Sequence, residues 1–249
     1  MIELKTPEEM ARMRKAGAIV ANLLRLLASR VAPGIKTKDL DAAAGEFIRT
    51  HGAQPAFLGY RGFPATICVS LNEEVVHGIP GERRIRSGDV VSIDAGAKLD
   101  GYYADAAITV AVGEVGQHVK RLIEVTKEAL DKAIAMATPA HRLSDLSHTI
   151  QQTVEQDGLS VVRDFVGHGI GRQMHEDPPI PNYGPPDRGP RLKTGMVLAI
   201  EPMVTMGTWE IEVLPDGWTA VTKDRSLSAH FEHTVAITDR GPEVLTSLS

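Results

Sequence analysis

Two aspartates lie within the strongest β pattern of the sequence. Residues 90–112 form two apolar runs joined by Asp100-Gly101, which predicts a β-hairpin with a type I′ turn. In that register cross-strand partners have numbers that sum to 201, so Asp94 and Asp105 are diagonal neighbours on one face, about 5.5–8 Å apart. Two buried carboxylates this close repel each other unless a cation lies between them. By itself the pair is more simply explained as two solvated aspartates, although the apolar residues that flank both indicate a covered sheet.

Three further segments carry side chains that can bind a metal ion. The run Gly167-His168-Gly169-Ile170-Gly171 leaves an imidazole on a nearly bare backbone, while Glu201 ends one apolar strand pattern and Glu232 begins another. Glutamate at such positions is normally paired or metal-bound; alone, each is more often part of a core salt bridge, and the histidine an incidental part of a glycine loop. A dinucleotide-binding loop is excluded because Pro178 and Pro179 stop the helix that it needs. The short zinc-protease motifs, the serine-hydrolase elbow and the phosphate-binding loop are absent.

Taken together, these residues resemble a known family. The sequence is similar to the type I methionine aminopeptidases, in their short bacterial form, in the run from Asn72 to Pro80 and in five spaced residues: Asp94, Asp105, His168, Glu201 and Glu232. The resemblance implies an α+β pita-bread fold, in which two pseudo-symmetric α/β halves surround a curved, mainly antiparallel sheet with a dimetal site between them. We therefore expect one catalytic domain over residues 1–249, with halves of about 1–114 and 115–249.

The same resemblance implies that the five spaced residues hold two divalent metal ions per chain, with Asp105 and Glu232 bridging both. Four carboxylates and one imidazole, with no thiolate, suit Mn, Fe, Co or Zn. Carboxylates can bridge two ions about 3.5–4 Å apart, as in two-metal hydrolases. Four negative charges against two dications leave the filled site close to neutral, which explains how so many acidic residues can gather there.

The implied activity is removal of the N-terminal methionine from a polypeptide whose second residue is small. A water between the two ions would attack the carbonyl of the first peptide bond, and the free N-terminal amine would bind one metal and confine cleavage to the first residue. By resemblance, His77 hydrogen-bonds the scissile amide and His175 stabilises the developing oxyanion. Glu201 would carry the proton from the nucleophile.

A pocket for the methionine side chain is also implied by the resemblance. Beside His77 and His175, its lining would be Phe57, Tyr60, Phe63, Cys68, Met174 and Trp218. A thioether packs well on aromatic edges and soft sulfur, so this composition is chemically reasonable. The sequence departs from the commonest bacterial pattern at Phe57, Phe63 and Met174, where Cys, Tyr and Phe are frequent, which leaves the shape of the pocket open.

The elements that must position these residues follow from hydrophobic periodicity. Thr6-Pro7-Glu8-Glu9 predicts a capped helix start. We expect helices from 7 to about 33, 37–51, 116–137 and 144–156, with Ser144 capping the last. Residues 56–72 are expected to be extended with a bend, and 178–190 to be a surface loop. The remaining strands are expected at 161–166, 196–204, 209–213, 218–221 and 231–238. Helices followed by strands thus occur twice, which predicts two similar halves.

Composition limits the partners and the compartment. The chain has 249 residues, 43% of them hydrophobic, a formal charge of −5 and a single cysteine. These values exclude a disordered or disulfide-stapled protein and give no support for nucleic acid as the main partner. No apolar run is long enough for a membrane helix, and the first residues are too charged for a signal peptide. We therefore expect a cytoplasmic monomer that acts on N-terminal methionine and binds neither specific DNA nor a membrane. Arg83, Arg84 and Arg86 could contact ribosomal RNA transiently, but a solvated charged loop is the favoured interpretation.

Two alternatives remain at this stage. A proline-specific aminopeptidase or dipeptidase of the same fold shares the five ligands, but such enzymes usually carry an extra N-terminal domain. A non-catalytic binding scaffold of the same fold would be expected to have lost ligands, whereas all five are present here.

Overall fold

The structure is a computed structural model that describes residues 2–247. The first elements of the chain are two helices that form a helical hairpin. Helix α1 covers Pro7–Arg30 and helix α2 covers Thr37–Thr50. The side chain of Thr6 accepts a hydrogen bond from the backbone N–H of Glu9, and the Glu9 carboxylate accepts one from the backbone N–H of Thr6. Both helices lie close to the boundaries that the sequence predicts, because the capping box and the glycine and proline stops are local signals.

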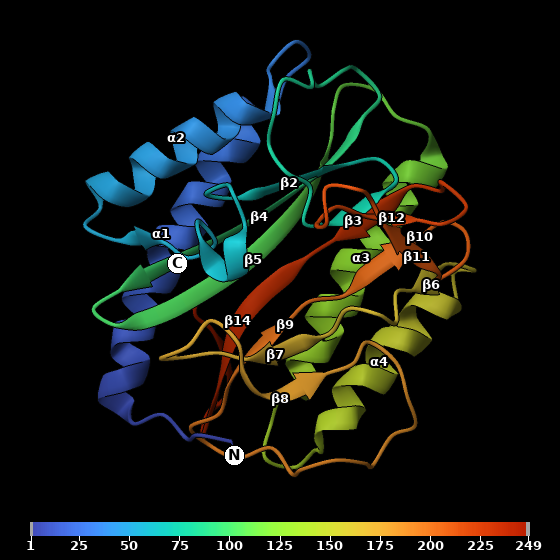
Figure 1. The fold of residues 1–249 in the computed structure, drawn as a ribbon. Helices are drawn as coiled ribbons and strands as arrows, with labels where there is room; N and C mark the ends of the chain where they lie inside the picture. Colours follow the sequence, from blue (N-terminus) through green and yellow to red (C-terminus); the bar gives the residue numbers. More distant parts are fainter. Residues whose placement is uncertain (1, 248–249) are drawn as a thin grey trace.

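A nine-stranded sheet contains strands from both expected halves of the chain. Its path is β1-β4-β5-β14-β9-β7-β8, with β2 paired to β4 and β15 paired to β14, all antiparallel. Its strands are Gln54–Pro55 (β1), Cys68–Leu71 (β2), Val90–Leu99 (β4), Tyr102–Ala111 (β5), Gly167–Gly169 (β7), Glu176–Ile180 (β8), Val197–Ile200 (β9), Glu232–Thr238 (β14) and Gly241–Val244 (β15). Because β5 pairs with β14, the two halves share one sheet at its centre (Figure 1).

Two smaller three-stranded sheets complete the β structure, in the orders β13-β10-β6 and β11-β12-β3. Their strands are Glu74–Val76 (β3), Ser160–Val161 (β6), Met203–Thr205 (β10), Ile211–Val213 (β11), Ala220–Thr222 (β12) and Ser228–His230 (β13), and a short 3₁₀ turn, η1, covers Tyr60–Gly62. The pairing of β3 with β12 is a second place where the two halves are hydrogen-bonded to each other.

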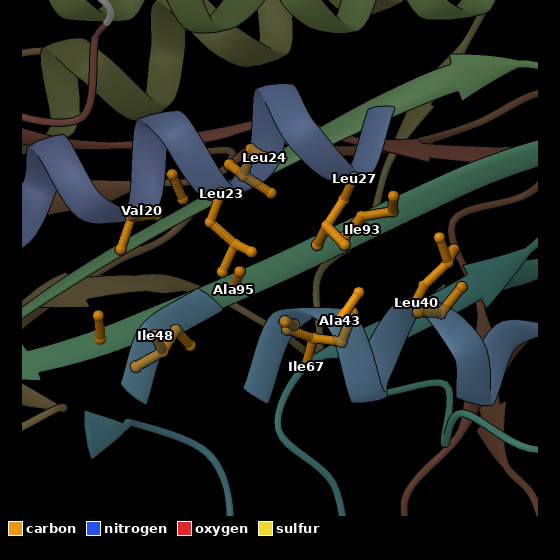
Figure 2. Close-up of a cluster of buried hydrophobic side chains, with 14 of the residues drawn as sticks. Val20, Leu23, Leu24, Leu27, Leu40, Ala43, Ile48, Ile67, Ile93 and Ala95 are labelled. Carbon is orange, nitrogen blue, oxygen red and sulfur yellow. The ribbon is translucent and has the colours of Figure 1, made fainter. Parts of the chain in front are cut away.

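Each half of the large sheet is covered by its own helix pair. Helices α1 and α2 pack on β4 and β5, whereas α3 (Gln117–Met136) and α4 (Leu143–Glu155) pack against β9 and β14 (Figure 1). Figure 2 shows side chains of α1 and α2 directed toward β4, among them Leu23, Leu27 and Leu40. No helix within residues 2–247 has the length and apolar character that crossing a membrane requires.

Strand alternation separates an apolar face from a polar one. On β4 the odd-numbered residues, such as Ile93 and Ala95, belong to the helix-covered core, so Asp94 between them faces the opposite side. On β5 the even-numbered Ala104 and Ala106 face the helices, and Asp105 faces away from them. The acidic residues therefore share the face of the sheet that the helices leave uncovered.

The hairpin register is confirmed residue for residue. Asp94 pairs with Ala107 and Gly96 pairs with Asp105, as the turn at Asp100-Gly101 requires. Both turn residues have positive φ, at 49° and 85°, in agreement with a type I′ turn.

Several expected boundaries are wrong, each for a local reason. The last helix is not capped by Ser144: it starts at Leu143, and the Asp145 carboxylate accepts the backbone N–H of Arg142 at 2.7 Å. The strand expected over 196–204 breaks into β9 and β10 at Glu201-Pro202, since proline has no N–H for the ladder.

The expected surface loop at 178–190 also starts too early, because residues 178–180 belong to β8. This strand lies at the edge of the sheet, where proline is tolerated. The strand expected at 161–166 is limited to β6, Ser160–Val161. Residues 248 and 249 of the expected C-terminal half lie outside the described residues.

Candidate metal centre and substrate cavity

Three carboxylates converge because three neighbouring strands place them on one face. Ala107 of β5 pairs with Asp94 of β4 on one side and with Glu232 of β14 on the other. Asp105 precedes Ala107 by two residues, so its side chain leaves β5 on the same face as Asp94 and Glu232. Residues 94, 105 and 232 are thus brought together by register, although 127 positions of sequence separate the last two.

His168 and Glu201 reach the same centre from β7 and from the end of β9. His168 pairs with Ala199, and Glu201 follows directly after the last residue of β9. The His168 Nε2 lies 3.6 Å from Glu201 Oε1. Asp105, His168 and Glu232 each offer a ligand atom, and these three atoms lie within 4.8 Å of one another. These three residues thus have an arrangement that can bind a metal ion, and Asp94 and Glu201 line the same cavity.

The glycines around His168 are explained by close packing rather than by flexibility. A Cβ on Gly167 would collide with the carbonyl of Ala199, and one on Gly169 would collide with the carbonyl of Asp177. Strand β7 is held tightly between β9 and β8, which fixes the position of the imidazole.

Burial makes the ionised carboxylates of this centre costly in the absence of a cation. Burial raises the pKa of Asp94 to about 6 and that of Glu201 to about 8. Burial, together with the neighbouring Asp94 and Glu201 carboxylates, raises the pKa of Asp105 well above its usual range. The pKa of Glu232 is also raised well above its usual range, first by burial and then by the neighbouring Asp105 carboxylate. Groups perturbed in this way at the base of a cavity are typical of functional sites.

The donor set fits divalent metal ions. Within residues 2–247, Asp94 Oδ1, Asp105 Oδ1 and Glu232 Oε1 are buried and have no hydrogen-bond partner. A buried polar atom without a partner costs about 1–3 kcal/mol, and more when it is charged. The pKa of His168 falls to about 3, chiefly through burial, so its imidazole is neutral and able to bind a metal. Bound cations would satisfy the three oxygens and reverse the pKa shifts of the carboxyl groups.

A cavity of about 140 Å³ opens above the acidic residues. Every predicted site residue lines it, and so does Arg61: Phe57, Tyr60, Phe63, Cys68, His77, Asp94, Asp105, His168, Met174, His175, Glu201, Trp218 and Glu232. It is smaller than the roughly 300–1,000 Å³ of sites for drug-sized ligands, so it suits a single side chain. One end of the cavity is acidic, and the rest is mostly aromatic or sulfur-containing.

Cys68 lies in the cavity because of sheet register. It is opposite Asp94 in the pairing of β2 with β4. The thiol is buried, and burial followed by the nearby Asp94 raises its pKa well above the usual range, so the group is a neutral thiol. The Phe63 and Trp218 rings meet edge to face, with centroids 5.2 Å apart, and form an adjacent part of the wall.

His77 is held in an unusual backbone conformation. Its φ is 61°, a left-handed value that costs about 1–3 kcal/mol and is found mostly at functional sites. The next residue must be glycine, because a Cβ on Gly78 would collide with the carbonyl of Val69. The ring of His77 contacts Phe165 edge to face, at 5.2 Å between centroids. Burial lowers the pKa of His77 to about 4, so the side chain is neutral.

His175 lies between the metal centre and the aromatic wall. Its ring centroid is 4.1 Å from that of His168, and its Nδ1 is 2.9 Å from the hydroxyl of Tyr60. Burial, and then the charge of Arg61, lowers its pKa. This arrangement places a neutral imidazole directly beside the acidic residues.

Two residues at the site were not predicted as site residues. Arg61 lines the cavity with a positive φ of 50°. His230 is buried, with its Nε2 3.6 Å from Glu201 Oε2 and without a hydrogen-bond partner among the described residues. Neither residue had a periodic signal in the sequence: His230 ends β13, before the break at Phe231 that separates it from β14, and Arg61 lies in the short turn η1.

Two of the three basic residues considered as a ribosome contact, Arg83 and Arg84, have side-chain partners within the protein. Arg83 bonds the Glu74 carboxylate at 2.6 Å, and Arg84 bonds the carbonyl of Gly34 at 2.6 Å. These contacts agree with a charged surface loop and do not themselves indicate a binding partner.

Residues 11–239 match metallopeptidase family M24, and the chain belongs to this family. Within it, the chain is 55% identical over 246 residues to Methionine aminopeptidase 1 of Bacillus subtilis, with 99% of each chain covered. The crystal structure of methionine aminopeptidase from Thermotoga maritima superposes on it with a TM-score of 0.98, at 51% identity and over 100% of each chain. The family resemblance and the pita-bread fold are thereby confirmed.

A proline-specific relative is more distant. The solved prolidase from Pyrococcus furiosus is 25% identical with a TM-score of 0.81, and this chain covers only 66% of it. The identity of 51–55% to methionine aminopeptidases, against 25% to the prolidase, distinguishes the two enzyme classes that the sequence left open.

Proposed function

We propose that the chain is a metal-dependent aminopeptidase that removes N-terminal methionine from polypeptides with a small second residue. The observation that carries the proposal is the cavity itself, in which four carboxylates and an imidazole lie at the base of an apolar space for one side chain. The methionine aminopeptidases that match over 99–100% of both chains support the same substrate.

Asp94, Asp105, His168, Glu201 and Glu232 would hold two divalent ions, drawn from Co, Mn, Fe and Zn. Such ions, when bound, lower the pKa of a water and polarise a peptide carbonyl. The three carboxylate oxygens without partners support this assignment. Asp105 and Glu232 lie on adjacent central strands and, by the family resemblance, would be shared between the two ions.

The remaining polar groups would handle protons and orient the substrate. Glu201 is assigned to proton transfer, because its two carboxylate oxygens lie beside the other acidic residues, each 3.6 Å from the Nε2 atom of a neighbouring histidine, His168 or His230. We assign His175 to the developing oxyanion, because the centroid of its neutral ring lies 4.1 Å from that of His168, beside the acidic residues. His77, which also lines the cavity and is also neutral, is assigned to the scissile amide.

The apolar part of the cavity would bind the methionine side chain. Its thioether would contact the rings of Phe57, Phe63 and Trp218 and the sulfur atoms of Cys68 and Met174. Tyr60 closes this wall on the side of His175, to which it is hydrogen-bonded.

We further propose that residues 1–249 act as one catalytic domain in the cytoplasm, as a monomer, with at most transient ribosome contact. The support for one domain is that residues of both halves line the same cavity. A single buried cysteine, which forms no disulfide, agrees with a reducing compartment.

The test is peptide cleavage by protein freed of metal with a chelator. We expect no cleavage of Met-Ala-Ser by the metal-free protein and recovery when Co, Mn, Fe or Zn is added back singly. An Ala-Pro peptide is the matched control and should remain intact. Cleavage of Ala-Pro in preference to Met-Ala-Ser would identify a proline-specific enzyme, and metal binding with no cleavage of either would identify a scaffold.

A further inference from the structure

The loop between β7 and β8, residues 170–175, carries both Met174 and His175 into the cavity. Short loops of this kind do not hold a side chain firmly unless other elements fix them. This loop is fixed at both ends by the segment around the start of α1, residues 5–9, none of which lines the cavity.

The first tether is the ion pair between Lys5 and Glu176. The Lys5 Nζ lies 2.7 Å from Glu176 Oε2, and the two side chains are only 2% and 12% exposed. The other oxygen of Glu176 accepts the backbone N–H of Gln173 at 3.0 Å. Glu176 directly follows His175, so the pair fixes the chain on either side of Met174 and His175.

Lys5 also packs against the loop backbone. A Cβ on Gly171 would lie 2.7 Å from Lys5 Nζ and 2.9 Å from Glu176 Oε1. Lys5 is itself anchored, because its backbone N–H donates to the carbonyl of Gly195 at 2.7 Å. Glu3 is a second partner of the ammonium at 3.0 Å, but its side chain is 63% exposed and therefore a weak restraint.

The second tether is Glu9 with Arg172. Glu9 Oε1 accepts bonds from Arg172 Nη2 at 2.9 Å and from the Tyr102 hydroxyl at 2.7 Å. Its other oxygen is the acceptor in the capping box of α1. The Arg172 guanidinium also lies over the ring of Tyr102, 5.5 Å from its centroid. One carboxylate thus joins the helix start, strand β5 and the loop.

We propose that Lys5 and Glu9 are positioning residues that hold His175 at the metal centre through Glu176 and Arg172. The inference rests on the proposed role of His175 in the aminopeptidase reaction. Neither residue would touch substrate or metal, so their effect would be transmitted entirely through the loop. A displacement of a catalytic group by about 1 Å can cost about a hundredfold in rate.

The test uses Lys5→Met, which keeps an unbranched side chain without the charge, and Arg172→Met. The matched control is Arg14→Met, which removes another ion pair of α1, to Glu243 on β15, away from the loop. Each is measured alone and combined with His175→Ala, for kcat on Met-Ala-Ser, metal content, and hydrogen exchange of the amides of residues 171–176.

We expect Lys5→Met to lower kcat about tenfold to a hundredfold, and Arg172→Met, whose side chain is 65% exposed, to lower it by a smaller factor. Both should speed exchange of the loop amides, with metal content unchanged. In the His175→Ala background neither should lower kcat further, because the group that they position is gone. Arg14→Met should leave kcat and loop exchange unchanged. A general loss of stability would instead lower kcat equally in both backgrounds, and that result would overturn the proposal, as would normal kcat in both tether variants.

Two results distinguish an incorrect role for His175 from an incorrect role for the residues that position it. If His175→Ala alone keeps normal kcat, the proposed role of His175 is wrong, and the positioning role is wrong with it. If His175→Ala is slow but both tether variants are normal, only the positioning role is wrong. Removing one partner of a buried ion pair can prevent folding. In that case Lys5→Met is combined with Glu176→Gln, so that neither charge remains buried without a partner. Arg172, whose side chain is 65% exposed, can be replaced without this risk, so Arg172→Met with and without His175→Ala is an independent test.

Discussion

The two sides of the cavity are built on opposite principles. On the metal side, Asp94, Asp105 and Glu232 leave regular strands, and each keeps a buried oxygen without a partner among the described residues. On the substrate side, His77 and His175 lie outside the strands and contact neighbouring rings of Phe165 and Tyr60. The carboxylates of the metal side therefore need positive charge from a bound ion, whereas the histidines of the substrate side already have partners within the protein.

This difference predicts what each side does when it is altered. A strand residue with an unsatisfied oxygen is held by the sheet, so its removal changes binding of the ion and leaves the fold intact. A residue outside the strands, held by its neighbours, changes the geometry offered to the substrate and leaves the ion bound. Activity and metal content should therefore separate the two sides.

The largest effect is expected from Asp105→Asn and Glu232→Gln. Each removes a charge assigned to both ions, so we expect activity to be abolished and metal content to fall. Metal analysis of the purified variants beside cleavage of Met-Ala-Ser tests this. Either variant retaining two metals with normal turnover would show that the acidic centre is not the metal side.

His175→Ala should cost about 10²–10³ in kcat with metal content retained, as loss of an oxyanion donor typically does. The comparison is sharpened by measuring both quantities on the same preparation. If the metal is lost together with activity, His175 belongs to the metal side and its assigned role is wrong.

A smaller effect is expected from the second residue of the substrate. We expect the wall formed by His77 and the loop that holds His175 to leave little room beyond the scissile bond, and repacking such a wall costs about 1–3 kcal/mol. Met-Leu-Ser should therefore be cleaved about 5- to 150-fold more slowly than Met-Ala-Ser, measured as kcat/KM. Equal rates for the two peptides would show that the substrate side does not select by size.

The last prediction concerns the stability of the metal-free protein and its dependence on pH. The pKa of Asp94 at about 6 and of Glu201 at about 8 means that the folded, metal-free protein holds protons that the unfolded chain releases near pH 4. Its stability should then fall as pH rises from about 4 to about 8, on the order of several kcal/mol at about 1.4 kcal/mol per pKa unit, and its Tm should fall with it.

Thermal unfolding of the chelated protein at pH 5.5, 7 and 8.5, with and without added Mn, measures this. Metal should stabilise most at the highest pH, because the ion replaces those protons. Glu201→Gln, which cannot titrate, is the matched control and should give a flatter profile. A chelated protein that gains stability toward pH 8.5 contradicts the account of the acidic side.

Much of the fold could be predicted because its signals are local. The capping box at Thr6 and Glu9 starts α1 where expected, and Asp100-Gly101 fixes the hairpin register on which Asp94 and Asp105 depend. Two of the boundaries that were predicted wrongly have a common origin in proline. Pro202 divides an apolar run that reads as one strand, and Pro178 is admitted to β8 only because that strand lies at the edge of the sheet.

The sequence by itself determined which groups are present for chemistry, and the resemblance that they carry, since residue type and spacing along one chain are visible in it. Only the tertiary structure decided that Ala107 pairs with Glu232, that Cys68 lies opposite Asp94, and that Lys5 reaches Glu176. These contacts join positions far apart in the chain. They depend on strand order and on burial of charge, and neither leaves a periodic signal in the amino-acid sequence.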